Sequence, residues 1–175
     1  MAPIEKKREQ ILEAAVQEFQ ERGFQGTSMD RISERANVSK RTVYNHFESK
    51  EALFKAIVEL IFNEISETLN IVYDPALPLE DQLLTLGRAE GRLMCSKRFM
   101  RLARMAMSET IRDPALAAEM NAKSEAISVF NDFMSAALKA KTIDTDDPEE
   151  AGAQFIGLIK SRAFWPYILN GGTVG

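Results

Sequence analysis

The residues best suited to chemistry lie in one short segment, residues 39–45, which reads Ser-Lys-Arg-Thr-Val-Tyr-Asn. Lys and Arg side chains can bond guanine, Asn can pair with adenine through two hydrogen bonds, and Thr can touch the methyl group of thymine. A Tyr hydroxyl can reach a phosphate oxygen. This combination of side chains predicts contact with double-stranded DNA.

Composition argues against the competing class, a helical enzyme. The chain has 175 residues with one His and one Cys, so it holds neither two imidazoles for a metal nor an internal disulfide. A di-iron bundle would need two Glu-x-x-His motifs, and no glycine-rich phosphate loop is present. A nucleophilic pair would have to join Cys95 to His46, which fall in different expected domains. We therefore expect no catalytic residues, no metal and no cofactor.

Charge is unevenly distributed along the chain. The formal net charge is −4, yet residues 31–50 contain five basic side chains and only two acidic ones. A local positive patch of this kind suits a phosphate backbone even in an acidic protein. Hydrophobic residues make up 45% of the chain, no stretch is long and apolar enough for a membrane span, and the first residues lack the apolar core of a signal peptide. These features predict a globular, cytoplasmic protein.

Apolar periodicity predicts an all-α fold. The first helix is expected over residues 4–22, ended by Gly23 in a left-handed cap with Phe24 folding back onto it. Two short helices follow, capped by Ser28 and Ser39, and Asn37 can accept the positive φ of the turn between them. Later helices are expected over residues 49–72, 79–95, 97–110, 114–140 and 148–169, the last kinked by Pro166.

The two short helices, 28–35 and 39–45, form a helix-turn-helix in this interpretation. The second helix of that motif lies in the major groove and presents its first residues to base edges. Val43 and Phe47 are expected to point inward and fix this helix against the first one. The helix that begins at Ser49 and Lys50 offers backbone amides and an ammonium group to a further phosphate.

These residues resemble the DNA-binding domain of the TetR family of bacterial transcriptional regulators over about residues 5–60. The resemblance is carried by Gly23-Phe24, by residues 26–33, by residues 36–39 and by residues 42–54, with Asn37 standing where the family usually has Gly. Farther along, Arg104, Glu109 and Pro114 look like a pattern found in one subgroup of the family's C-terminal domains.

The resemblance implies a helix-turn-helix DNA-binding domain over residues 1–48, followed by a linker helix and an effector-binding and dimerisation domain over residues 49–175. It implies a homodimer on a near-palindromic operator, most simply a repressor that a small-molecule effector releases. An architectural or activating helix-turn-helix protein without an effector is the alternative. By position, the residues expected at bases are Lys40, Arg41, Thr42 and Asn45, and those expected at phosphates are Thr27, Ser39, Tyr44, His46 and Lys50. Ser28 also belongs to the expected DNA-binding set.

Two further sets of residues are candidates in the second domain. Methionines concentrated between Met94 and Met134 either fill the core or line an adaptable pocket, and the basic stretch from Arg88 to Arg112 is either a solvated face or a site for an anionic effector. The candidate effector residues are Arg88, Met94, Arg104, Met105 and Phe130. The last two expected helices are apolar on two faces, which predicts a two-fold helical contact with a second copy through Ala126, Val129, Phe133, Phe155 and Ile159.

Overall fold

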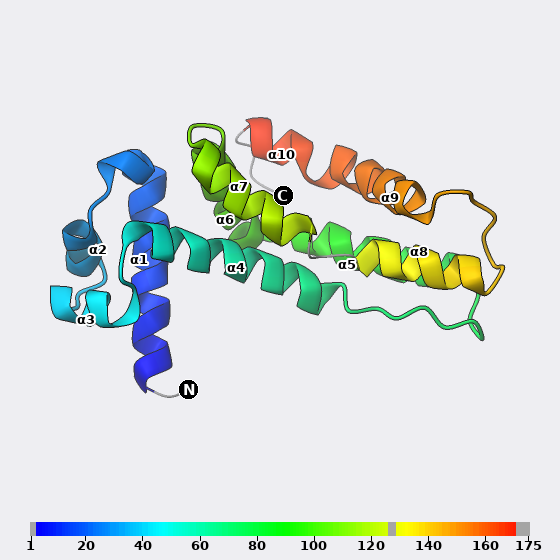
Figure 1. The fold of residues 1–175 in the computed structure, drawn as a ribbon, viewed down its shortest axis with the longest axis horizontal. Helices are drawn as coiled ribbons and strands as arrows, with labels where there is room; N and C mark the ends of the chain where they lie inside the picture. The colour runs from blue at the N-terminus through cyan, green and yellow to red at the C-terminus, as the bar shows by residue number, and fades with distance from the viewer. Residues whose placement is uncertain (1–2, 126–128, 171–175) are drawn as a thin grey trace. The chain divides into compact units, whose positions relative to one another are not determined.

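The computed structural model describes residues 3–125 and 129–170. Every regular element in these ranges is a helix, which confirms the all-α prediction (Figure 1). The helices are α1 (Pro3–Gly26), α2 (Met29–Arg35), α3 (Lys40–His46), α4 (Lys50–Thr68), α5 (Leu79–Met94), α6 (Lys97–Thr110), α7 (Pro114–Glu125), α8 (Val129–Lys139), α9 (Pro148–Ala163) and α10 (Trp165–Asn170). None of the described helices is both long enough and apolar enough to cross a bilayer.

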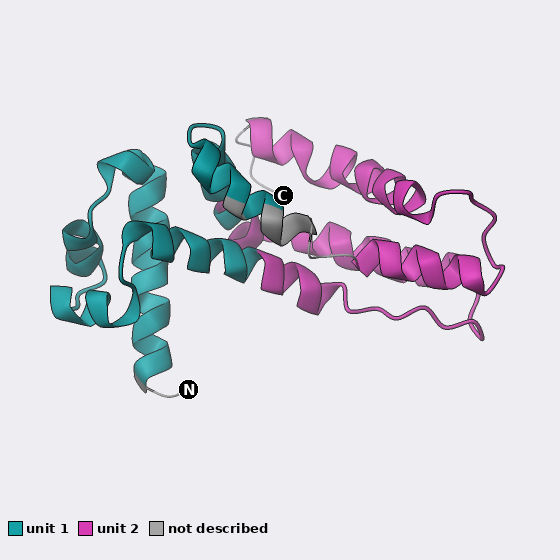
Figure 2. Ribbon diagram, viewed as in Figure 1, with its two compact units in different colours: residues 1–61, 102–122 teal, residues 62–101, 123–175 magenta. Residues whose placement is uncertain are grey.

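The chain forms two compact units, which Figure 2 distinguishes by colour. The first unit comprises residues 1–61 and 102–122, and the second comprises residues 62–101 and 123–175. The division therefore falls inside α4, whereas the sequence placed a domain boundary at residues 48 and 49. The second half of α6 joins the helix-turn-helix in the first unit although it lies far away in the sequence.

Aromatic rings organise the core of the first unit. Phe19 of α1, Phe24 beyond its break and Phe54 of α4 are at most 3% exposed. Their ring centroids lie 5.3 to 6.5 Å apart, at distances typical of favourable aromatic pairs. Phe24 packs on Phe19 as the sequence predicted. This cluster joins α1 to α4 behind the helix-turn-helix.

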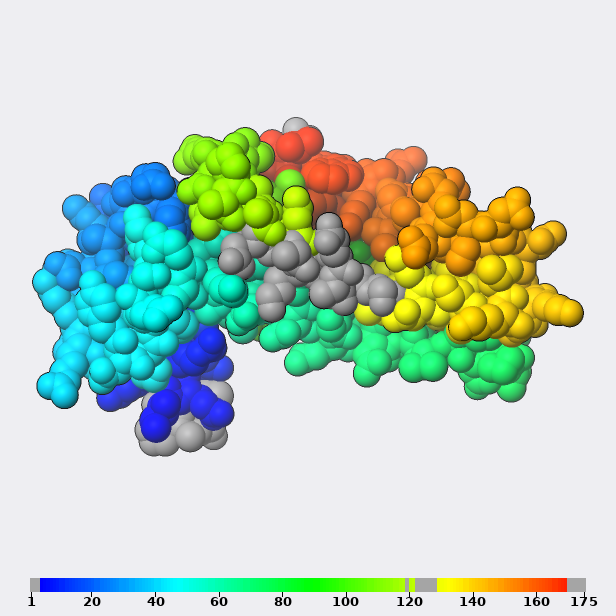
Figure 3. Space-filling view, in the orientation of Figure 1, coloured from blue at the N-terminus to red at the C-terminus, as the bar shows by residue number. Residues whose placement is uncertain are grey.

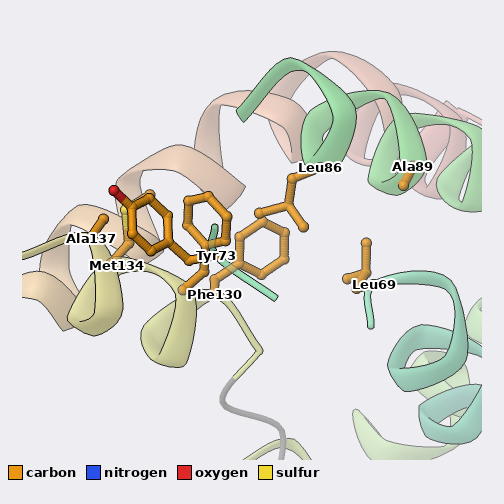
Figure 4. Packing of buried hydrophobic residues seen from close by; sticks show 8 residues of the cluster. Leu69, Tyr73, Leu86, Ala89, Phe130, Met134 and Ala137 are labelled. Atoms are coloured by element: carbon orange, nitrogen blue, oxygen red, sulfur yellow. The ribbon is translucent and has the colours of Figure 1, made fainter. Parts of the chain in front are cut away.

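A separate cluster forms the core of the second unit (Figure 4). Tyr73 and Phe133 meet edge to face with centroids 5.4 Å apart, and the Tyr73 hydroxyl shares a short hydrogen bond with Thr142. Leu69, Leu86, Ala89, Phe130, Met134 and Ala137 complete the buried cluster. It draws together the segment after α4, α5 and α8, and Phe155 and Ile156 of α9 pack against it.

Local signals placed most helix ends correctly, with three differences. Gly23 has the expected positive φ of 72°, but its ψ of 167° is extended rather than left-handed, a conformation open almost only to Gly. α4 ends at Thr68 instead of residue 72. The last expected helix stops at Ala163 and resumes as α10, because Pro166 lacks the N–H that would continue the ladder. Residues 126–128, expected inside one long helix, lie outside the described residues.

Candidate nucleic-acid interface

Side-chain caps fix the helix-turn-helix. The Ser28 hydroxyl accepts a hydrogen bond from the Arg31 amide, and the Ser39 hydroxyl accepts one from the Thr42 amide. Asn37 has a φ of 52°, the positive value expected for the turn. These contacts confirm the predicted caps and turn, and they set the orientation of α3 relative to α2.

α3 has one buried and one exposed face. Val43 is completely buried and Phe47, which follows the helix, is 5% exposed, so both point inward as predicted. Lys40, Arg41, Tyr44 and Asn45 are exposed, and the segment lies at the surface in the space-filling view (Figure 3). The structure thus brings the four side chains with the clearest DNA-binding chemistry onto the solvent side of one short helix.

The two cations at the start of α3 differ in their surroundings. The Lys40 ammonium lies 2.6 Å from a carboxylate oxygen of Asp30, and this hydrogen bond raises the pKa of Lys40. Both side chains are more than half exposed, so water screens the pair. Arg41 makes no hydrogen bond or ion pair with any described residue. Arg41 is therefore free to meet DNA directly, whereas Lys40 would first exchange Asp30 for its new partner.

Two of the residues assigned to phosphates, Thr27 and Lys50, already have protein partners. Thr27 is 4% exposed, and its hydroxyl donates to the backbone oxygens of Glu18 and Gly23. The Lys50 ammonium donates to the Phe24 carbonyl at 2.7 Å and lies 4.5 Å from the centre of that ring. Both side chains therefore bind the backbone of α1, and their contacts with DNA remain predictions.

Three other residues expected at DNA, Ser28, Ser39 and His46, lie nearer the surface. Ser28 and Ser39 are exposed and already act as caps. His46 is half-buried beside the ring of Phe47. The DNA-contact roles of these three side chains also remain predictions.

The expected positive patch is smaller than the sequence suggests. Arg35 donates to Glu18 at 2.6 Å and forms a short ion pair with Glu21, and these bonds raise the pKa of Arg35 and lower that of Glu21. Arg35 therefore holds α2 against α1 instead of adding charge to the surface of α3. No local pattern in the sequence predicts this pairing, because the partners lie 14 and 17 residues away.

A contact that the sequence did not predict joins α6 to the end of α1. The Phe24 amide donates to a carboxylate oxygen of Glu109 at 3.0 Å, and Glu109 is 4% exposed. Both residues belong to the first unit. The family-like pattern of Arg104, Glu109 and Pro114 was the one available signal, and it carried no information about the partner.

The candidate effector residues divide between the two units. Arg88, Met94 and Phe130 belong to the second unit, and Arg104 and Met105 belong to the first. Met94, Met105 and Phe130 are buried and Arg88 is exposed. In the second unit a groove of about 470 Å³ is lined by Leu79, Glu80, Leu83, Leu84, Gly87, Arg88, Phe155 and Ile159.

Most of the candidate dimer residues are occupied within their own chain. Phe133 is 2% exposed in the core, and Val129 packs against it. The ring of Phe155 lies 5.8 Å from that of Phe130, and Ile159 approaches Gly87 of α5. Ala126 lies outside the described residues. The exposed apolar side chains of α9 and α10 are instead Leu158, Trp165 and Leu169.

Glu90 of α5 is a buried carboxylate with one oxygen that accepts no hydrogen bond from the described residues. It is 3% exposed, and its Oε2 atom has no hydrogen-bond partner among the residues that the structure describes. Burial raises the pKa of Glu90, and the positive charge of Lys160 opposes this only in part. The described residues contain no group of three or more side chains that could hold a metal ion.

Two protein-family models match the chain, one in its N-terminal part and one in its C-terminal part. Residues 11–57 match the N-terminal domain of the bacterial regulatory proteins of the TetR family. Residues 81–174 match the C-terminal domain of AefR-like transcriptional repressors. Together these matches cover most of the chain.

Solved structures agree over nearly the whole length. A TetR family transcriptional regulator from Pseudomonas syringae is 39% identical with a TM-score of 0.79, and the match covers 95% of this chain and 84% of that one. The flavonoid-responsive regulator FrrA is 32% identical with a TM-score of 0.72, covering 95% and 85% of the two chains.

Similarity to curated relatives is concentrated in a shorter segment. The transcriptional repressor DhaR from a Mycobacterium species is 35% identical over 69 residues, which are 39% of this chain and 35% of DhaR. The matched segment thus spans about a third of that relative. The matching domains and the exposed, capped α3 lead to one conclusion: the chain belongs to the TetR family, whose members are not enzymes, and it is a DNA-binding transcriptional regulator.

Proposed function

We propose that this regulator is a homodimeric repressor that a small-molecule effector releases from a near-palindromic operator. The observation that carries the DNA half of the proposal is the solvent face of α3, where Arg41, Tyr44 and Asn45 are exposed on a helix capped by Ser39. Arg41 and Lys40 would donate to guanine, Asn45 would pair with adenine, and Thr42 would contact a base. Operator binding also requires the compartment that holds the chromosome, which fits the expected cytoplasmic location.

Phosphate contacts would fix the register of the protein on the duplex. Tyr44 is 53% exposed, and Arg41 and Asn45 of the same helix are exposed as well. Ser39 and His46 flank this face at the two ends of α3. Thr27, Ser28 and Lys50 complete the proposed set. At Lys50, the first residue of α4, the backbone amides of the helix start would be the main phosphate donors.

The effector half of the proposal rests on the second unit. The groove of about 470 Å³ has the size of a small-molecule site, and Leu83, Gly87 and Phe155 give it apolar walls. Similarity to FrrA, described as responsive to flavonoids, favours an aromatic or amphipathic effector, and Arg88 would contribute polarity. The match to AefR-like repressors favours repression over activation.

The dimer half of the proposal follows from surplus apolar surface. Leu158 is 72% exposed and Leu169 is 74% exposed, and Trp165 lies between them in sequence. A two-fold contact would cover this surface and place two copies of α3 for successive major grooves, about 34–36 Å apart. We therefore assign the contact to Leu158 and its neighbours, since Phe133 is already buried inside one chain.

Selection from a random duplex library tests the proposal. We expect the full-length protein to enrich duplexes with two inverted half-sites whose centres lie about one helical turn apart, or a multiple of that distance. A compound screen by thermal shift would then identify effectors, and a hit should weaken binding to the selected duplex without dissociating the dimer. Failure to enrich any sequence would contradict the DNA half, and hits that leave duplex binding unchanged would contradict the effector half.

A further inference from the structure

The backbone N–H and C=O of Phe24 each bond to a different helix. Gly23 departs from helical dihedral angles, with φ of 72° and ψ of 167°, so the Phe24 N–H leaves the helical ladder and donates to Glu109 of α6 at 3.0 Å. The Phe24 carbonyl accepts from Lys50, the first residue of α4, at 2.7 Å. The backbone of this one residue therefore links α1, α4 and α6 within the first unit.

Glu109 has little other support for its charge. The Ser108 hydroxyl lies 3.5 Å from Oε1, and the Arg112 guanidinium lies 3.9 Å from the same atom with 71% of its side chain exposed. The Phe24 amide therefore provides the short hydrogen bond to this carboxylate, and a bond to an ionised acceptor is stronger than a neutral one. A displacement of Glu109 breaks that bond unless the Phe24 backbone moves with it.

Phe24 is also close to the DNA-binding helices. Thr27 donates to the carbonyl of Gly23 at 2.9 Å, and Ser28 directly afterwards caps α2. The ring of Phe24 is packed between Phe19 and Phe54, which prevents it from rotating freely. Movement of the Phe24 backbone is thus passed to the start of α2 through Thr27 and Ser28, which are themselves hydrogen-bonded.

From this geometry we infer that Glu109 is the positioning residue that couples α6 to the helix-turn-helix, through its hydrogen bond to the Phe24 amide. The inference rests on the proposed function, since it describes how occupancy of the C-terminal helices changes DNA binding. A change that shifts the end of α6 alters the orientation of α2 and α3. Binding of DNA to α3 in turn restrains α6.

Thermodynamic reciprocity allows a test without an effector, because coupling has the same size in both directions. The probe is the duplex enriched in the library selection, and the readout is amide hydrogen exchange of the full-length protein. In the wild type we expect the duplex to slow exchange of the Phe24 amide and of amides in α6 by a similar factor, about 5-fold or more. In Glu109→Leu the duplex should still slow exchange in α2 and α3 but leave α6 unchanged.

Two matched variants separate coupling from simple loss of a buried charge. Glu109→Gln keeps an oxygen that can accept from the Phe24 amide, so it should restore most of the response in α6. Glu90→Gln removes the charge of a buried carboxylate in the second unit and should leave the response intact. A structural role alone would instead raise exchange throughout the first unit in Glu109→Leu, with or without DNA.

The outcomes distinguish the inference from the proposed function. If the wild type enriches no duplex, the proposed function fails. If it binds a duplex and α6 is slowed while the Phe24 amide is not, the coupling does not pass through this bond and the inference is wrong. That wild-type comparison decides the question even if Glu109→Leu does not fold. A folded Glu109→Leu protein that still slows α6 on binding would also overturn the inference.

Discussion

Glu109 in the first unit and Glu90 in the second are buried to the same degree but differ in their partners. Glu109 accepts from the Phe24 amide, whereas Oε2 of Glu90 has no hydrogen-bond partner among the described residues and burial raises the pKa of Glu90. The first unit also pairs Arg35 with two acids and Lys40 with one. The second unit instead exposes Leu158 and Leu169. Polar contacts therefore fix geometry in the first unit, and apolar surface dominates the second.

The largest effect is expected from the exposed apolar surface of the second unit. Leu158→Asp should leave the fold intact, because the side chain is 72% exposed, but it should separate the proposed dimer. Losing the second half-site should weaken binding to the selected duplex by about 10²–10⁴-fold. Sedimentation velocity and duplex titration measure the two effects. Ala153→Asp, on another face of α9, is the control, and a Leu158→Asp protein that remains dimeric would place the interface elsewhere.

The second-largest effect is expected from removing Glu109, the buried acceptor of the Phe24 amide in the first unit. Glu109→Leu leaves the Phe24 N–H without its partner, and the free energy of unfolding should fall by about 1–3 kcal/mol. Glu109→Gln should lose less, because its amide oxygen can still accept the bond. Chemical denaturation of the three proteins gives the ranking. Equal stability of the wild type and Glu109→Leu would show that this contact does not support the first unit.

Replacing Glu90 should raise the stability of the protein, the opposite of the effect at Glu109. Its raised pKa means that the folded state disfavours the ionised form, so the cost to stability is present above the folded-state pKa and disappears as the pH falls below the unfolded value. Glu90→Gln should therefore stabilise the protein near pH 7, on the order of 1 kcal/mol or about 2–4 °C in Tm. Thermal unfolding at pH 7 and pH 4 tests this, with the gain shrinking in acid. Destabilisation at pH 7 would mean that the charge is compensated.

The smallest effect should come from one hydroxyl on α3. Tyr44→Phe removes the proposed phosphate contact without changing the apolar body of the side chain, so duplex affinity should fall by about 0.5–1.5 kcal/mol. The loss should be the same for selected and unrelated duplexes, since phosphates carry no sequence information. Fluorescence anisotropy with both duplexes measures it. A loss confined to the selected duplex would assign Tyr44 to a base instead.

The sequence predicted the parts of the fold that short-range chemistry determines. Ser28 and Ser39 cap their helices, Asn37 adopts positive φ, and α9 begins at Pro148, each as expected. Such devices act within a few residues, so their signals are complete in the local sequence.

The candidate site was less predictable because its contacts span long distances. Glu109 and Phe24 are 85 residues apart, and neither residue type implies the other. The sequence does not indicate that Asp30 pairs with Lys40 in the folded chain. It also does not indicate that Phe133 packs against Tyr73 of the same chain and not against a second copy. Amphipathic patterns show that a helix has two apolar faces but not which of them the chain covers itself.

Affinity for the selected duplex in Lys40→Ala/Arg41→Ala is the most direct test of DNA reading by α3. Arg41 has no partner among the described residues and Lys40 has only a screened one, so the double variant should fold as the wild type does. We predict that affinity for the selected duplex falls by at least the 1–3 kcal/mol of one bidentate base contact, while preference over unrelated DNA is reduced. Wild-type affinity and preference in the folded double variant would contradict the assignment of α3 as the reading helix.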